Sequence, residues 1–401
     1  MKNIATETTL AGMYESILEK LSLWQDVAGE IWKNPELAYQ EHFACKKQLD
    51  TLSLLGFTSM ENPYCGLDTA FRAEFVNGEG GAVFAVCSEY DALPGLGHGC
   101  GHNLICTAAL AAFYAMREVM IRENIAGKIV LFGTPAEESY GGKVKMLEKN
   151  CLDNVDAVIM VHPSARCILD AGSTAICRYD VTFHGKAAHA SASPELGLNA
   201  LDAVMLLFNA VNAFRQQMPD CCRVHGIVMD GGEAPNIIPE TASCRFFLRS
   251  LDQKWMDILD KRFHDMVRGA ELMTATRAET VLFNIPYKGR LPNKVMNESF
   301  FEYAAMLDMK PQRPTAPGKG SSDFGDFSRK VPGIHAYFAA TTQPAASHSV
   351  EMLEASNTPF ALDQALRSAA VMALIGIRFL TDAEYRAEVK KDFEINSSSG
   401  K

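Results

Sequence analysis

Short apolar runs alternate with helical patterns between residues 81 and 162, and this alternation constrains the fold more than any other feature of the chain. Three runs have the length and composition of buried strands: GAVFAVCSEYD (81–91), KIVLFGTPAEE (128–138) and DAVIMVH (156–162). The segments between them, 102–122 and 142–150, have helical patterns. Because strands joined through helices form parallel sheets, we predict an α/β fold with a mostly parallel sheet and helices on both faces.

The pattern changes near residue 175. Two helical segments, 196–216 and 253–273, are interleaved with four strand-like segments in the order strand, helix, strand, strand, helix, strand. That order is typical of a ferredoxin-like α+β module. Since a chain of 401 residues exceeds one ordinary core, we predict two domains. Residues 175–287 form the inserted module, and residues 1–174 and 288–401 form the other domain.

The flanking segments complete the larger domain. Helices are expected over 11–33 and 40–55, before the first strand. After about residue 290 we expect a helix, a loop rich in glycine and serine over 318–325, a strand over 333–340 and a final helix over about 357–380.

Composition excludes several classes of partner. The formal net charge of −10 argues against nucleic acid and anionic membranes, since both bind through basic patches. We expect no apolar run of the roughly 18–20 residues that a membrane helix needs, and MKNIATETTLAG at the start lacks the apolar region of a secretory signal. The odd number of cysteines, 11, does not indicate a disulfide framework. We therefore expect a cytoplasmic protein without a nucleic-acid or membrane partner.

The segment GHGCGHN (97–103) places a cysteine and a histidine two residues apart in a glycine-rich turn after the first strand. A thiolate and an imidazole are both good ligands for a soft or borderline divalent metal. Taken alone, the pair of Cys100 and His102 is a weak signal, because a reactive thiol with a neighbouring base has the same residues.

Further ligands follow the other predicted strands. Glu137 and Glu138 end the second strand, His162 ends the third, and His348 follows the strand over 333–340. The carboxyl ends of parallel strands meet at one edge of a sheet, so we expect these side chains to converge there. Five ligands exceed the four of a tetrahedral structural zinc and suit two metals close together. The predicted ligands are Cys100, His102, Glu138, His162 and His348.

The two adjacent glutamates need different roles. If Glu138 binds metal, Glu137 can hold a water molecule and take its proton as a general base. Asp91, at the end of the first strand, is expected to orient the ligand His102.

Each of these signals has a simpler explanation when it stands alone. A histidine at a strand end is more often a hydrogen-bonded structural residue, and a pair of glutamates is usually solvated. Two other function classes stay open: a thiol hydrolase with Cys100 as nucleophile and His102 as base, and a non-catalytic binding protein. The thiol mechanism leaves the glutamate pair and the other two histidines unexplained. A non-catalytic protein is expected to have lost Glu137, which is present.

Several motifs together resemble one family. They are GHGCGHN, GTPAEE, the strand end at His162, GKAAHAS (185–191), GGEAPNIIPE (231–240) and SSDFGDFS (321–328). The chain is similar along nearly its whole length to the amidohydrolase branch of the aminoacylase/carboxypeptidase G metallopeptidases. That branch includes N-acyl-amino-acid amidohydrolases, p-aminobenzoyl-glutamate hydrolase and aminoacylase-like dipeptidases.

The resemblance implies the same five metal ligands, with Glu137 as the general base. It implies two divalent metal ions, and the ligands allow zinc, manganese or cobalt, with the thiolate favouring zinc. The segment around His348, SHSVEMLEASNTPFA, departs from the family's usual His-Thr-Pro-Glu-Phe context, and the nearby rival His335 lies within a predicted strand.

The resemblance also assigns roles to the inserted module, as a lid and as the surface of a homodimer. His189 and Asn236 match positions that contact the substrate, His189 in its own or in the partner subunit's site. Arg249 is a candidate for binding a substrate carboxylate. The implied substrate is an N-acyl amino acid or a dipeptide with a free carboxylate. A peptidase specific for one peptide or for a substrate like p-aminobenzoyl-glutamate is the alternative.

Overall fold

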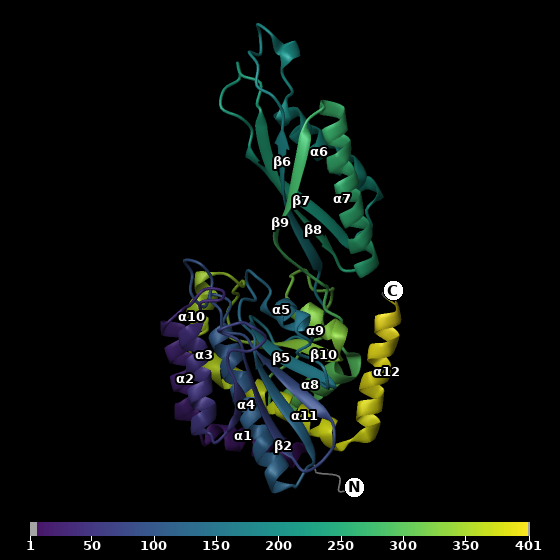
Figure 1. The fold of residues 1–401 in the computed structure, drawn as a ribbon. Coiled ribbons are helices and arrows are strands. Elements are labelled where there is room, and N and C mark those ends of the chain that lie inside the picture. Colours follow the sequence, from purple (N-terminus) through teal and green to yellow (C-terminus); the bar gives the residue numbers. More distant parts are fainter. Residues whose placement is uncertain (1–5, 400–401) are drawn as a thin grey trace. The chain divides into compact units, whose positions relative to one another are not determined.

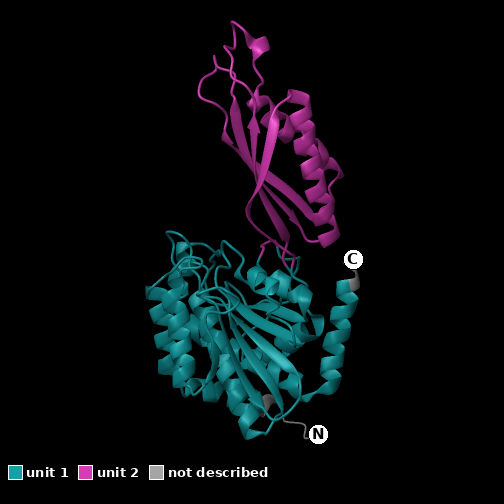
Figure 2. Cartoon of the chain, viewed as in Figure 1, with its two compact units in different colours: residues 1–172, 290–318, 322–399 teal, residues 173–289, 319–321, 400–401 magenta. Residues whose placement is uncertain are grey.

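The computed structural model describes residues 6–399, and the chain divides into two compact units (Figure 2). Unit 1 runs from the first described residue to Gly172 and includes Arg290–Gly318 and Ser322–Ser399. Unit 2 contains Ser173–Gly289 and Lys319–Ser321. Each unit has its own hydrophobic core.

The centre of unit 1 is a sheet of six strands in the order β1-β2-β4-β3-β5-β10. Figure 1 shows this sheet among the surrounding helices, with β2, β5 and β10 labelled. The four strands β4, β3, β5 and β10 are parallel, whereas β1 and β2 run antiparallel at one edge. This agrees with the predicted α/β class. The strand bounds are β1 Ser59–Glu61, β2 Phe71–Asn77, β3 Val83–Ser88, β4 Gly127–Gly133, β5 Ala157–Ser164 and β10 Gly333–Ala339.

Helices cover both faces of this sheet. Alternate residues of β3 contact opposite cores: Phe84 and Val86 pack with α4 and α11, while Ala85 and Cys87 pack with α5 and α9. The helix bounds in unit 1 are α1 Thr6–Leu18, α2 Leu21–Lys33, α3 His42–Leu54, α4 His102–Arg122, α5 Gly142–Glu148, α8 Lys294–Met306, α9 Phe324–Lys330, α10 Val350–Ala355, α11 Pro359–Thr381 and α12 Ala383–Ser399.

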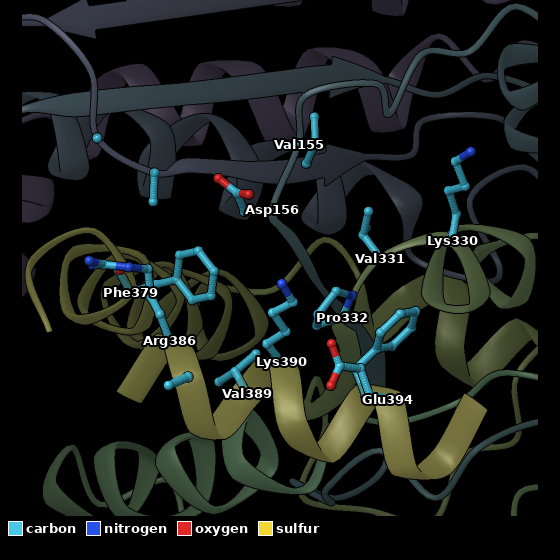
Figure 3. Close-up of a pocket in the computed structure, with 14 residues that line it drawn as sticks. Val155, Asp156, Lys330, Val331, Pro332, Phe379, Arg386, Val389, Lys390 and Glu394 are labelled. Atoms are coloured by element: carbon cyan, nitrogen blue, oxygen red, sulfur yellow. The ribbon is translucent and has the colours of Figure 1, made fainter. Parts of the chain in front are cut away.

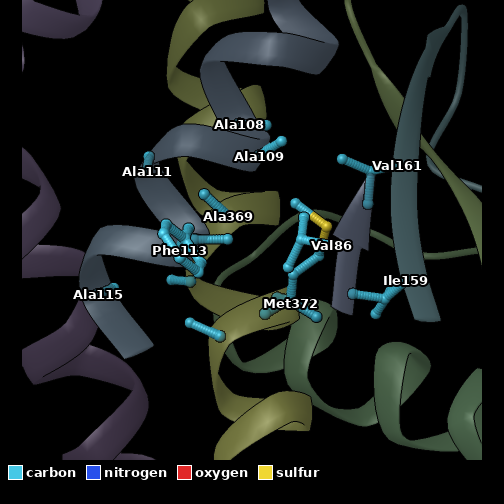
Figure 4. Close-up of a cluster of buried hydrophobic side chains, with 14 of the residues drawn as sticks. Val86, Ala108, Ala109, Ala111, Phe113, Ala115, Ile159, Val161, Ala369 and Met372 are labelled. Carbon is cyan, nitrogen blue, oxygen red and sulfur yellow. The ribbon is translucent and has the colours of Figure 1, made fainter. Parts of the chain in front are cut away.

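The helices α4 and α11 form the main core of unit 1. Side chains from α4, α11, β3 and β5 meet there, including Phe113, Met372, Val86 and Ile159 (Figure 4). Both helices are long and apolar enough to cross a membrane by length and composition, so the expectation that no such run exists was wrong. In each helix, 83% of the most apolar 18-residue segment is buried inside the protein. The apolar composition is therefore explained by packing in the core.

Several elements of unit 1 differ from the sequence predictions. The single helix expected over 11–33 is broken between α1 and α2, where the indole of Trp24 donates to the carbonyl of Ile17 at 2.8 Å and satisfies a helix-end acceptor. The strand β2 was not predicted, although buried Phe71 and Ala73 alternate with the partly exposed Arg72 and Glu74, as in a strand with one face against the core. The helix α12 follows α11 and buries little more than Tyr385 and Val389.

Unit 2 has the ferredoxin-like order predicted from the sequence. Its four strands form an antiparallel sheet in the order β7-β8-β6-β9. The two helices α6 and α7 pack together and against this sheet, with Leu207, Phe246 and Phe263 in the shared core. The bounds are β6 Ala175–His184, α6 Ala200–Phe214, β7 Cys222–Asp230, β8 Thr241–Ser250, α7 Gln253–Thr274 and β9 Arg277–Tyr287, with short 3-10 turns at Pro194–Leu196 and Arg215–Gln217.

Candidate metal centre

The predicted ligands of unit 1 lie at the carboxyl ends of its parallel strands or in the segments that follow these ends. The strand β3 is followed by β4 on one side and then by β5 on the other, so the chain reverses its direction of winding beside β3. Loops on either side of such a reversal leave a crevice, which is where open α/β sheets bind ligands. His162 lies near the carboxyl end of β5 itself, and the other four predicted ligands lie in the segments that follow β3, β4 and β10.

The structure brings these five ligands together. The ligand atoms of Cys100, His102 and His162 lie within 4.8 Å of one another, and so do those of Cys100, Glu138 and His348. The two groups share the thiol of Cys100, whose Sγ lies 3.4 Å from His162 Nε2. The two groups resemble the halves of a two-metal centre with a bridging ligand.

Two polar contacts orient the ligands toward this point. His102 Nδ1 lies 3.0 Å from Asp91 Oδ1, and the other oxygen of Asp91 accepts a 2.9 Å hydrogen bond from the backbone N–H of Glu138. His162 Nδ1 lies 2.7 Å from the carbonyl oxygen of Pro163. In both histidines Nε2 is thereby left for a metal, which is how metal-binding imidazoles are commonly held.

The donor set fits two divalent metals. His102 Nε2 is fully buried and has no hydrogen-bond partner among the described residues, although Glu138 Oε1 lies 3.6 Å away. A buried donor or acceptor without a partner is costly, and a metal ion would satisfy it. His348 Nε2 lies 3.3 Å from Glu138 Oε1, so the structure places His348 beside the other predicted ligands.

The thiol of Cys100 has surroundings that suit a ligand better than a nucleophile. Burial raises its pKa, and the negative charge of Glu138 raises it further. Reactive cysteines need the opposite, an electropositive and partly exposed site that stabilises the thiolate. A bound dication supplies that stabilisation and deprotonates a coordinating thiol.

Glu137 lies beside this centre. A carboxylate oxygen of Glu137 and the ligand atoms of His102 and Glu138 lie within 4.8 Å of one another. Burial raises the pKa of Glu137 well above its usual value, and the carboxylates of Glu138 and Glu89 raise it further. The preceding residue, Ala136, has a positive φ of 62°, and its N–H donates to the buried carboxylate of Glu41 at 2.8 Å. The loop that presents Glu137 is therefore fixed from its backbone side.

The sequence reasoning missed four charged residues around the centre. Glu41, Glu89, Lys143 and Asp323 are all fully buried in unit 1. Glu89 lies two residues before Asp91 at a strand end, which was a usable signal. Lys143 had none, because a lysine in the first turn of a short helix is ordinarily solvated.

In unit 2, two of the three predicted substrate residues are neighbours. His189 and Asn236 lie on adjacent exposed segments, where the N–H of Ala190 donates to the carbonyl of Asn236 at 3.0 Å. His189 Nδ1 accepts from the N–H groups of Ser191 and Ala192, which leaves Nε2 for another partner.

Arg249 lies elsewhere in unit 2. Arg249 pairs with Ile176 on the neighbouring strand β6. His184, at the other end of β6 and close to His189, pairs with Thr241, which is eight residues from Arg249 along β8. That separation is about 26 Å at the rise of a β-strand. Arg249 donates to Ser321 Oγ at 3.1 Å. Within one chain, the structure therefore does not bring Arg249 together with His189 and Asn236.

A pocket of about 600 Å³ lies in another part of unit 1, at the amino ends of the parallel strands and beside α12 (Figure 3). Its lining contains Lys330 and Lys390 together with Asp156 and Glu394, and apolar side chains such as Phe379. The mixed charges favour no single class of ligand. None of the predicted metal ligands lines this pocket.

Comparison with known proteins gives relatives that cover most of the chain. Residues 172–272 match the model of a peptidase dimerisation domain. An Xaa-Arg dipeptidase of Mus musculus is 36% identical and covers 91% of this chain and 87% of its own length. One of the subunits of the p-aminobenzoyl-glutamate hydrolase of Escherichia coli is 32% identical over 70% of this chain and 61% of its own length.

Solved structures agree on the fold. An aminohydrolase from methicillin-resistant Staphylococcus aureus aligns with a TM-score of 0.78 at 19% identity, covering 92% of this chain and 99% of the other. A dinuclear metal-binding peptidase of the M20 family from Bacillus subtilis aligns with a TM-score of 0.66 at 20% identity, covering 91% of this chain and 99% of the other.

Proposed function

This chain belongs to the M20 family of peptidases, and from that premise we propose that it hydrolyses the amide bond of a dipeptide or an N-acyl amino acid with a free carboxylate. The observation that carries the proposal is the convergence of five metal ligands and a further glutamate at one edge of the unit 1 sheet. The relatives act on the same class of bond, since their names describe a dipeptidase, a p-aminobenzoyl-glutamate hydrolase and an N-acetyl-L-cysteine deacetylase.

The ligand set defines what the metals would do. Two divalent cations held by Cys100, His102, Glu138, His162 and His348 would polarise the scissile carbonyl and acidify a water molecule. The thiolate favours zinc, with manganese and cobalt as the alternatives.

The remaining steps belong to residues of the chain. Glu137 takes a proton from the attacking water and delivers it to the leaving amine, as a general base that then acts as a general acid. Burial and the neighbouring carboxylates raise its pKa, which makes Glu137 a stronger base than a solvated glutamate. His189 and Asn236, whose side chains are exposed, are the proposed donors to the carbonyl oxygen of the substrate, in the same chain or in a partner subunit.

We propose a dipeptide as the first substrate class to examine, because the dipeptidase relative covers more of this chain than the p-aminobenzoyl-glutamate hydrolase does. The panel should contain dipeptides with basic, acidic and apolar carboxyl-terminal residues, N-acyl amino acids, and p-aminobenzoyl-glutamate. Protein stripped of metal and reloaded with zinc, manganese or cobalt identifies the metal that supports turnover.

The proposed mechanism is tested by Glu137→Gln. This variant should keep its bound metal and its substrate affinity, because Glu138 and the other ligands are unchanged. Its kcat should fall by roughly 10²–10⁴-fold, the usual contribution of a general base. Metal content, substrate binding and steady-state kinetics measure the three properties, and Glu79→Gln at an exposed loop is the matched control.

Two results would contradict this mechanism. Full activity of Glu137→Gln would exclude Glu137 as the base. Activity that survives EDTA but is lost to iodoacetamide would favour the thiol hydrolase over the metal enzyme.

The assembly we propose is a homodimer formed through unit 2. The match to a dimerisation domain covers most of this unit. Its strand β7 is an edge strand and carries three consecutive exposed apolar residues. The exposed fractions of Ile227, Val228 and Met229 are 60%, 49% and 51%. An apolar strand edge of this kind pairs readily with another chain. Light scattering on the purified protein measures the oligomeric state.

A further inference from the structure

A lysine with no exposed side chain lies beside the candidate metal centre. Lys143 is in the first turn of α5, five residues after Glu138, and the exposed fraction of its side chain is 0%. Its Nζ lies 2.5 Å from Glu89 Oε1 and 2.8 Å from Asp323 Oδ1, and both of these carboxylates are also buried. Lysine is seldom buried completely unless it is paired, and a positive charge at a helix amino terminus is unfavourable. The burial of Lys143 is therefore unfavourable unless its contacts compensate for it.

The contacts of Lys143 tie three separate segments together. Asp323 Oδ2 accepts a 3.0 Å hydrogen bond from the backbone N–H of Lys143, while Oδ1 pairs with Nζ. Asp323 directly precedes α9, and Glu89 directly follows β3. Lys143 itself follows the loop that carries Glu137 and Glu138. The arrangement thus anchors the end of the glutamate loop to two other parts of unit 1.

The same contacts reach the predicted catalytic groups. Carboxylate oxygens of Glu89, Glu137 and Asp323 lie within 4.8 Å of one another. The second oxygen of Glu89 lies 3.8 Å from Nε2 of the ligand His102. Three carboxylates at this separation, of which Glu89 and Asp323 are fully buried, repel strongly unless a cation lies among them. Burial lowers the pKa of Lys143, but Asp323 and Glu89 raise it well above its usual value, so the lysine is charged.

We propose that Lys143 is a positioning residue for the hydrolysis: its ammonium group, held between Glu89 and Asp323, fixes the carboxylate of Glu137 in the orientation of the base. The lysine acts as a tethered cation at a cluster of three carboxylates that could otherwise take up a further metal ion. This inference rests on the proposed function. It adds Lys143, Glu89 and Asp323 to the residues on which turnover depends.

The test compares Lys143→Met, Asp323→Asn and the control Lys145→Met on the same helix, where the side chain of Lys145 is 43% exposed. Both cluster variants should retain two metals per chain and a KM within about twofold of the wild type, because no metal ligand is changed. Their kcat should fall about 10- to 100-fold, the loss expected when a reacting group is displaced by about 1 Å. Lys145→Met should match the wild type in all three properties.

Asp323→Asn keeps the test decisive if the uncompensated charges prevent Lys143→Met from folding, because this variant retains the lysine and its pairing with Glu89. A cluster variant that is folded, carries the wild-type metal content and has the wild-type kcat would overturn the positioning role. So would a loss confined to KM or to metal content. No turnover by the wild-type protein on any member of the substrate panel would instead contradict the proposed hydrolysis itself.

Discussion

At the residue scale, single side chains of unit 1 hold more than one part of the site. Asp91 uses one oxygen to orient His102 and the other to accept from the N–H of Glu138, so one carboxylate positions two metal ligands. Glu41 acts in the same way on the base, since its two oxygens accept from Thr69 Oγ1 and from the N–H of Ala136. These carboxylates are buried, and their charge is therefore coupled to folding.

The coupling predicts a pH-dependent effect of Glu41→Gln in the metal-free protein. Burial, followed by the charge of Asp91, raises the pKa of Glu41 to about 7, whereas the unfolded value is near 4.5. The folded protein therefore binds the proton more tightly, and the wild type loses stability as the pH rises from about 4.5 to about 7. The variant lacks this charge, so it should be more stable than the wild type by about 3 kcal/mol at pH 8.

The difference should shrink to about 0.4 kcal/mol near pH 4.5, where Glu41 is protonated in the folded state and half protonated in the unfolded state. Urea unfolding at the two pH values, in EDTA, measures it. Glu61→Gln, at an exposed position of β1, should show no such change. An equal stability difference between Glu41→Gln and the wild type at both pH values would contradict the assignment.

At the element scale, close packing between helices determines whether a helical glycine can be replaced by alanine, which helix propensity alone does not predict. A Cβ atom at Gly376 in α11 would lie 2.4 Å from Met116 Sδ in α4 and 2.9 Å from the ring of Phe84 in β3. This glycine therefore allows α11 to lie against α4 and the sheet. A Cβ atom at Gly29 in α2 would meet nothing within 4 Å.

The two glycines should respond oppositely to alanine. Gly376→Ala should destabilise the protein by about 1–3 kcal/mol, because overpacking in the core outweighs the gain in propensity. Gly29→Ala should stabilise it by about 0.5–1 kcal/mol, since both positions are helical and only the packing differs. Urea unfolding at neutral pH measures both free energies, and a stabilised Gly376→Ala variant would show that the contact between α4 and α11 is looser than described.

At the scale of the whole molecule, the predicted metal site and the predicted dimerisation surface belong to different units. All five predicted metal ligands belong to unit 1, while the match to a dimerisation domain lies almost entirely in unit 2. Each unit also has a separate core. Metal binding should therefore stabilise one unit and leave the other unchanged.

Calorimetry should show this separation as two thermal transitions. EDTA should lower the transition of unit 1, since a ligand at 1,000 times its Kd contributes about 4 kcal/mol to the folded state, and should leave the transition of unit 2 in place. The fluorescence of a Trp255→Phe variant identifies the transition of unit 1, because Trp24 and Trp32, the other two tryptophans, both lie in that unit. Equal shifts of both transitions would contradict separate unfolding of the units.

The sequence by itself determined the order of most strands and helices, the ferredoxin-like insertion and the types of ligand at the strand ends. Periodicity encodes burial locally, and parallel strands bring their carboxyl ends to one edge, so Cys100, His162 and His348 could be grouped from the order of the strands alone. The sequence analysis missed the break between α1 and α2, and it missed the strand β2 although residues 71–75 alternate apolar and polar side chains.

Only the tertiary structure decided the contacts that depend on packing between distant segments. Lys143 contacts Glu89 and Asp323, which are 54 and 180 residues away along the chain, and no local pattern marks Lys143 or Asp323 as buried. The placement of Arg249 far along β8 from His189 likewise follows from strand register. The residue type determines which metals a side chain can bind, so the sequence shows it directly. The charged partners of a side chain depend on which segments the fold packs together, so only the tertiary structure shows them.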